Sequence, residues 1–118
     1  MNIIVDRPQL VRVVLLYLNK NFGNLTPKTN SEFPNSVFYV NSDNEIMMEY
    51  NKENSYVYIH DDRIWSKIES LFHLNYRDTQ SIMKVWLEET CKLRGVTPGL
   101  AMRLDSTRWM KIPNLNDI

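Results

Sequence analysis

The stretch SVFYVNSDNEIMMEYNKENSYVYIH, from Ser36 to His60, contains three short apolar runs separated by two polar groups of four residues. In the central run, Ile46, Met48 and Tyr50 fall on one side of an extended chain, and Met47 falls on the other side between two glutamates. This alternation is typical of a strand with one buried face. The stretch therefore predicts a three-stranded antiparallel meander.

The two polar groups have the composition of tight turns. They read Asn41-Ser42-Asp43-Asn44 and Asn51-Lys52-Glu53-Asn54. Asn and Asp side chains hydrogen-bond to their own backbone and tolerate the left-handed conformation, so each group predicts a hairpin connection. A small sheet of this kind is not stable alone, and we expect helices to cover one of its faces.

The segment before the meander predicts one helix and a loop. Asp6 is a suitable N-cap, Pro8 falls in the first turn, and a broad apolar face at helical spacing continues until Gly23. Residues 24–35 contain two prolines and no periodicity, which predicts an irregular connection. Residues 1–5 are β-prone and leave an additional edge strand open.

Two helices are predicted after the meander. Asp61 or Asp62 caps the first of them. Asn75 caps a longer helix that continues through Arg94 and ends at Gly95. The apolar stripe that this longer helix is expected to bury comprises Ile82, Val85, Trp86 and Leu93, extended by Met83, Leu87 and Cys91.

Together these segments predict an α+β fold in the order α-β-β-β-α-α. It has an N-terminal helix, the three-stranded meander, and two C-terminal helices packed on one sheet face. We expect one globular domain over residues 1–113 and a polar tail over residues 114–118. Leu100, Met102 and Leu104 alternate as in a further strand.

Cysteine usage and the length of the apolar runs indicate the compartment. Cys91 is the only cysteine, so no internal disulfide can form. Asp6, Arg7 and Arg12 interrupt the first apolar run, which does not resemble a signal peptide, and no run reaches the length of a membrane span. The sequence predicts a soluble, cytoplasmic protein without membrane contact.

Charge is balanced overall but unevenly distributed. The chain has 14 basic and 14 acidic residues, which is unusual for a dedicated nucleic-acid binder. Residues 36–62 carry six acidic residues and one lysine, whereas residues 92–111 carry five basic residues and one aspartate. The basic segment either lies near the acidic sheet or forms a surface for an acidic partner. In the second case Arg94, Arg103, Arg108 and Lys111 are the candidate nucleic-acid contacts.

Residues that could support catalysis are sparse. His60 precedes Asp61 and Asp62, but structural zinc sites use three or four nitrogen or sulfur ligands at recognisable spacings, which are absent here. Cys91 falls on the apolar side of a predicted helix, where a cysteine is usually a small core residue. No phosphate-binding loop or nucleophile elbow is present. We expect no enzyme activity, metal or cofactor, and a hydrolase or metal site centred on His60 ranks third among the functions considered.

The second face of the meander is the candidate binding surface. If the aliphatic residues of the meander face the helices, then Met47, Tyr56 and Tyr58 face outward, together with His60 and Tyr39. Methionine and aromatic side chains are enriched in protein interfaces. Two explanations stay open: this face contacts a partner or a second copy, or it is covered by residues 96–112 or by Met1 to Val5.

Parts of the chain resemble small uncharacterised proteins of marine tailed phages. The similarity lies in the opening Ile3–Leu10, from which Pro8 departs, and in the stretch Ser36–Pro98, above all Ile82–Glu89. It implies a phage origin and no known activity. The sequence therefore predicts a non-enzymatic protein-interaction protein, such as a phage accessory or host-directed factor. The alternative is a nucleic-acid-associated protein that uses residues 92–111.

Overall fold

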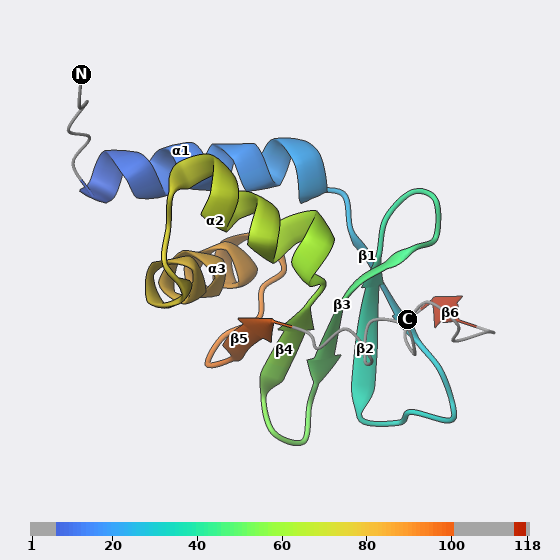
Figure 1. Cartoon of the computed structure of the whole chain (residues 1–118). Coiled ribbons are helices and arrows are strands. Elements are labelled where there is room, and N and C mark those ends of the chain that lie inside the picture. Colours follow the sequence, from blue (N-terminus) through green and yellow to red (C-terminus); the bar gives the residue numbers. More distant parts are fainter. Residues whose placement is uncertain (1–6, 101–114, 118) are drawn as a thin grey trace.

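The computed structural model describes residues 7–100 and 115–117 (Figure 1). The helices of this part are α1 (Arg7–Phe22), α2 (Ser66–Phe72) and α3 (Tyr76–Thr90), and a π-helical turn, η1 (Asp61–Trp65), leads into α2. The strands are β1 (Thr26–Thr29), β2 (Ser36–Val40), β3 (Ile46–Asn51), β4 (Tyr56–Ile59), β5 (Thr97–Leu100) and β6 (Asn116–Asp117). The expected strand at residues 1–5 and the expected N-cap Asp6 lie outside the described residues.

The strands form one mixed sheet in the order β5-β4-β3-β2-β1-β6. The pairs β2–β3 and β3–β4 are the two predicted hairpins, but the predicted three-stranded sheet is wrong. Five strands make up the sheet, the two-residue β6 extends it beside β1, and the order of the main elements is α-β-β-β-β-α-α-β. Strand β5 pairs with β4 in parallel, and the other pairs are antiparallel.

The missed strands have little strand character in their sequences. β1 reads TPKT and β5 reads TPGL, so neither alternates and each contains a proline. Pro27 is tolerated because, among the described residues, β6 pairs with Lys28 and Thr29 and β2 is the neighbour of Pro27. β5 reaches β4 through a crossover that contains α2 and α3, as a parallel pair requires.

The hairpin turns form as their asparagines predict. Asn41 Oδ1 accepts hydrogen bonds from the backbone N–H groups of Asp43 (3.0 Å) and Glu45 (2.9 Å). Asn51 Oδ1 accepts from the N–H of Glu53 at 2.9 Å. These side chains satisfy backbone donors that the ladder cannot reach, and they fix the hairpin connections.

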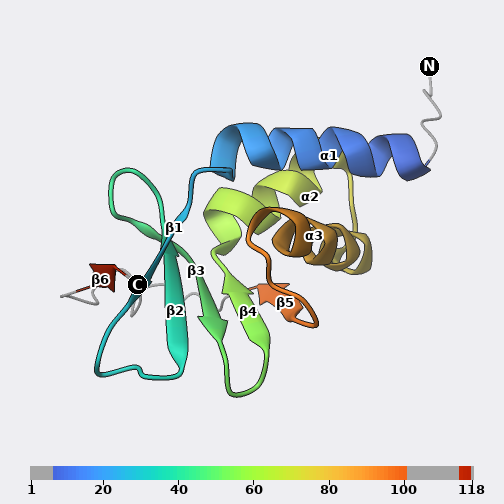
Figure 2. The same cartoon turned by 180° about the vertical axis from the view of Figure 1, so that it is seen from behind.

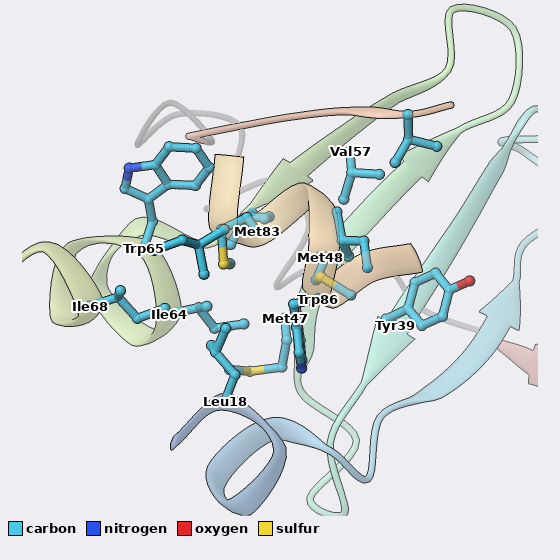
Figure 3. Close-up of a cluster of buried hydrophobic side chains, with 14 of the residues drawn as sticks. Leu18, Tyr39, Met47, Met48, Val57, Ile64, Trp65, Ile68, Met83 and Trp86 are labelled. Atoms are coloured by element: carbon cyan, nitrogen blue, oxygen red, sulfur yellow. The ribbon is translucent and has the colours of Figure 1, made fainter. Parts of the chain in front are cut away.

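All three helices lie on the same side of the sheet (Figures 1 and 2). Their buried residues and the helix-facing residues of the strands form one cluster, which we call the main core (Figure 3). Trp86 is fully buried in it, as predicted, and its Nε1 donates to Asn19 Oδ1 of α1 at 3.0 Å. This bond joins α3 to α1 inside the helical layer.

Two predictions about α3 need correction. Val85 is 38% exposed, because the buried stripe is formed by Ile82, Trp86 and two residues that were expected to extend it, Met83 and Leu87. The helix also ends at Thr90 and not at Arg94. Lys92 takes a left-handed conformation (φ 60°), and the N–H of Leu93 turns back to the carbonyl of Leu87 at 3.1 Å.

The starts of α2 and α3 differ. Asn75 caps α3 as predicted, because its side chain accepts from the N–H of Asp78 at 2.8 Å. The chain enters α2 through the π-helical turn η1. The N-cap residue of α2 is Trp65, and not Asp61 or Asp62 as predicted.

Candidate interaction surface on the outer sheet face

The face of the sheet opposite the helices, which we call the outer sheet face, carries two of the predicted binding residues. Tyr56 and Tyr58 point to this side, while Val57 and Ile59 between and beside them are fully buried in the main core. The predicted alternation of β4 is therefore confirmed. The two tyrosine rings are neighbours, with centroids 4.6 Å apart and planes at 44°. Both side chains are half-buried.

Met47 and Tyr39 do not lie where the sequence placed them. The pairing of β2 with β3 shifts between Tyr39 and Val40, so Tyr39 pairs with Met48 and Val40 pairs with Ile46. Met47 is the extra residue of this β-bulge, which turns its side chain to the helix side, where it is 2% exposed. Tyr39 also faces the main core and is 7% exposed. The outward orientation predicted for both residues is wrong.

Tyr56 reaches across the edge strand β5. A Cβ atom placed on Gly99 would collide with the Tyr56 hydroxyl and ring, so glycine is required where this ring crosses the strand. The Tyr56 hydroxyl is hydrogen-bonded to Tyr76 at the start of α3. Burial, followed by the nearby Tyr76 hydroxyl, raises the pKa of Tyr56 above its usual value.

Tyr76 is more exposed than Tyr56 and Tyr58. Its side chain is 45% exposed, and its ring packs on the fully buried Trp65, with centroids 4.8 Å apart. Its hydroxyl also accepts from the N–H of Leu100 at 3.4 Å. Tyr76 was not predicted as a binding residue, because its sequence context indicates only the start of a helix. We call Tyr56, Tyr58 and Tyr76 the tyrosine group.

The outer edge of β5 is occupied by side chains of α3. Gln80 Nε2 donates to the carbonyl of Pro98 at 2.9 Å, and Tyr76 accepts from Leu100. Pro98 itself has no N–H to offer. The Pro98 carbonyl and the Leu100 N–H are therefore already bonded to side chains, which is a common way of protecting a sheet edge.

The centre of the outer sheet face is a small second cluster. Phe38, Val40 and Ile46 are buried in it, and Phe33, Tyr58 and Leu115 pack against them. Phe33 meets Phe38 edge-on at 6.0 Å, so the loop after β1 covers part of this face. Leu115 contributes from the residues expected in the polar tail. This central part is therefore covered, but by Phe33 and Leu115 and not by any described residue of the segments 1–5 and 96–112 that the sequence suggested.

A buried polar pair lies beside the second cluster. Ser36 Oγ donates to Glu49 Oε2 at 2.6 Å, and both residues are almost completely buried. Glu49 pairs across the sheet with Phe38 and Tyr58. A carboxyl group is rarely buried without hydrogen bonds, and the serine supplies one of them.

The residues considered for metal binding or catalysis, His60 and Cys91, are poorly placed for these roles. His60 is 6% exposed at the end of β4. Among the described residues, no three His, Cys, Asp or Glu side chains are positioned to hold a metal ion. Cys91 caps the end of α3, and burial raises the pKa of its thiol to about 11, which disfavours the reactive thiolate.

The predicted nucleic-acid contacts fall largely outside the described residues. Arg103, Arg108 and Lys111 are all in that category. Arg94 is described: its side chain is 86% exposed and lies 3.9 Å from Glu88, an ion pair too open to hold it in place. The basic surface stays a prediction.

Comparison of the chain with protein-family models, with curated proteins and with solved structures finds no match. Within residues 7–100 and 115–117, no helix is long and apolar enough to cross a membrane.

Proposed function

We propose that this protein acts without catalysis and binds another protein through the tyrosine group at the β4–β5 edge. The observation that carries the proposal is the exposure of Tyr76 beside two half-buried tyrosines on the same edge. Tyrosine suits such a surface, because its ring can be buried at a contact while its hydroxyl keeps a polar partner. Tyrosine is also among the residues that contribute most to binding energy at interfaces.

The tyrosine group is held in place before any partner arrives. Tyr76 stacks on Trp65, which is fully buried, and Tyr56 is hydrogen-bonded to Tyr76. Tyr58 packs against the second cluster. Side chains that are already ordered lose little conformational entropy on binding, so their contact area converts more fully into affinity.

The mode of binding follows from the protected edge. Because Gln80 and Tyr76 occupy the outward groups of β5, a partner cannot extend the sheet there. The proposed contact is therefore made by side chains, with the tyrosine rings at its centre.

The resemblance to phage proteins suggests where to look for the partner. As part of the same proposal, the protein is a phage accessory or host-directed factor that acts in the host cytoplasm. A host protein is the first partner to seek, and a second copy of the chain is the next.

The test compares two surface variants with the parent. Tyr76→Ser removes the exposed ring, and Leu16→Ser changes a side chain of α1 that is 62% exposed and outside the tyrosine group. A partner captured from a host lysate is identified by mass spectrometry, purified, and titrated against each protein by calorimetry. We expect Tyr76→Ser to weaken binding by tenfold or more and Leu16→Ser to leave it unchanged. Equal affinities for the parent and Tyr76→Ser would refute the proposal.

A further inference from the structure

A cavity of about 150 Å³ lies on the helix side of the sheet, away from the tyrosine group. It is bounded by the junction between α1 and β1, where Phe22, Gly23, Leu25 and Pro27 line it. Tyr39 of β2 forms another wall. The end of α3 closes it with Thr90 and Cys91.

The cavity lies where three chain segments meet: the junction of α1 and β1, strand β2, and the end of α3. Gly23 has no side chain, and a Cβ atom there would collide with the backbone carbonyl of Asn19. α3 stops at Thr90, so no further helical turn fills the space. Apart from Tyr39, the lining residues are half-buried, which gives the cavity a route to solvent.

The walls of the cavity carry no charge. None of the seven lining residues is acidic, basic or histidine. The Thr90 hydroxyl already donates to Asn19 Oδ1 at 2.9 Å. Burial raises the pKa of the Cys91 thiol to about 11, so this group is also neutral. A charged ligand would lose its hydration without compensation, and the site therefore favours an uncharged one.

The Tyr39 hydroxyl is the distinctive polar group of the cavity. The residue is 7% exposed, and its side chain forms part of the cavity wall. Figure 3 shows the hydroxyl pointing away from the packed side chains of the main core. Burial raises the pKa of Tyr39 to about 12, so the hydroxyl keeps its proton at neutral pH and can donate it to an acceptor.

We propose that this cavity binds a small uncharged molecule with an apolar body and one hydrogen-bond acceptor, such as a cyclic ketone, and that Tyr39 donates to the acceptor. A cavity of this volume accommodates a molecule about as large as benzene. A ligand in the cavity displaces water from the Tyr39 hydroxyl, so a ligand that supplies an acceptor is preferred over one of the same shape that does not. This site is independent of the proposed protein contact.

The test uses two probes of nearly identical shape. Cyclohexanone carries a carbonyl oxygen, and methylenecyclohexane replaces that oxygen with a CH₂ group. Each is titrated into the ¹⁵N-labelled full chain, and the amide signals of Gly23, Tyr39 and Cys91 are followed. We expect saturable shifts with both probes and about fivefold tighter binding of cyclohexanone, which is the effect of one neutral hydrogen bond.

Two variants show whether the cavity and the hydroxyl are responsible. Tyr39→Phe keeps the ring and should make the two probes bind equally. Cys91→Met fills the cavity and should abolish binding of both, with Leu25→Phe as a second filling variant should Cys91→Met unfold. Non-saturating shifts in the parent would overturn the proposal. A preference for cyclohexanone that survives in Tyr39→Phe, or binding that survives both filling variants, would also overturn it.

Discussion

The two faces of the sheet are built differently. The helix-facing side belongs to the main core, which contains buried apolar side chains of all three helices and of β2, β3 and β4. On the outer sheet face, the buried apolar cluster of the described residues is limited to Phe38, Val40 and Ile46, and a serine–glutamate pair lies beside them. The tyrosine group at its edge is partly exposed.

This difference separates stability from binding. Burial of apolar surface is the main source of folding free energy, so the main core holds most of the stability. The outer sheet face has less apolar burial and keeps polar and aromatic groups near the surface. Substitutions on the two faces should therefore differ in both the size and the kind of their effect.

The largest effect is expected at Trp86 in the main core. Trp86→Ala removes a fully buried indole and its hydrogen bond to Asn19, and it should lower the free energy of unfolding by about 3–5 kcal/mol. Urea denaturation followed by circular dichroism measures this loss. Val85→Ala on the exposed side of the same helix is the control and should have a small effect. An unchanged urea midpoint for Trp86→Ala would show that Trp86 does not stabilise the core.

An intermediate effect is expected at the buried polar pair. Ser36→Ala leaves the Glu49 carboxyl without its 2.6 Å hydrogen bond and should lower the free energy of unfolding by about 1.5–3 kcal/mol. Ser31→Ala, at an exposed serine in the loop before β2, is the matched control. If both variants unfold at the same urea concentration, the pair does not contribute to stability.

The smallest effect is expected at the surface pair of Glu45 and Arg63, whose charged atoms are 2.6 Å apart. The hydrogen bond from Arg63, and a second from Asn41, lower the pKa of Glu45 to about 2. Because this pKa is lower in the folded protein than in the unfolded chain, the stabilisation is complete at neutral pH and is lost as the pH falls toward 2.

Thermal unfolding of the parent and of Glu45→Gln over this pH range measures the pair. The parent should melt at the higher temperature at neutral pH, and the difference should shrink as the pH approaches 2. A difference that stays constant over the whole range would show that the pair is not responsible.

The sequence predicted the parts of the fold that depend on local chemistry. Asn41 and Asn51 were recognised as turn residues, and Asn75 as a helix cap, because each acts on backbone groups a few residues away. The position of Trp86 was also predicted, since neighbouring apolar residues at helical spacing surround it. These features need no knowledge of distant segments.

The features that the sequence missed depend on distant segments. β1 and β5 are strands because β2 and β4 offer them hydrogen bonds, although TPKT and TPGL have little strand preference. Met47 was placed outward because strict alternation ignores a bulge, whose position is visible only in the pairing with β2. Tyr76 belongs to the candidate site because it contacts Tyr56 and Trp65, which come from other elements of the chain.

The central claim is that the tyrosine group touches a partner protein, and photo-crosslinking tests it most directly. The photoreactive amino acid p-benzoylphenylalanine replaces Tyr76 in one protein and Leu16 of α1 in a control protein, and each is irradiated with the captured partner. The account predicts a covalent adduct from position 76 and none from position 16. Adducts of equal yield from both positions, or an adduct from position 16 alone, would contradict it.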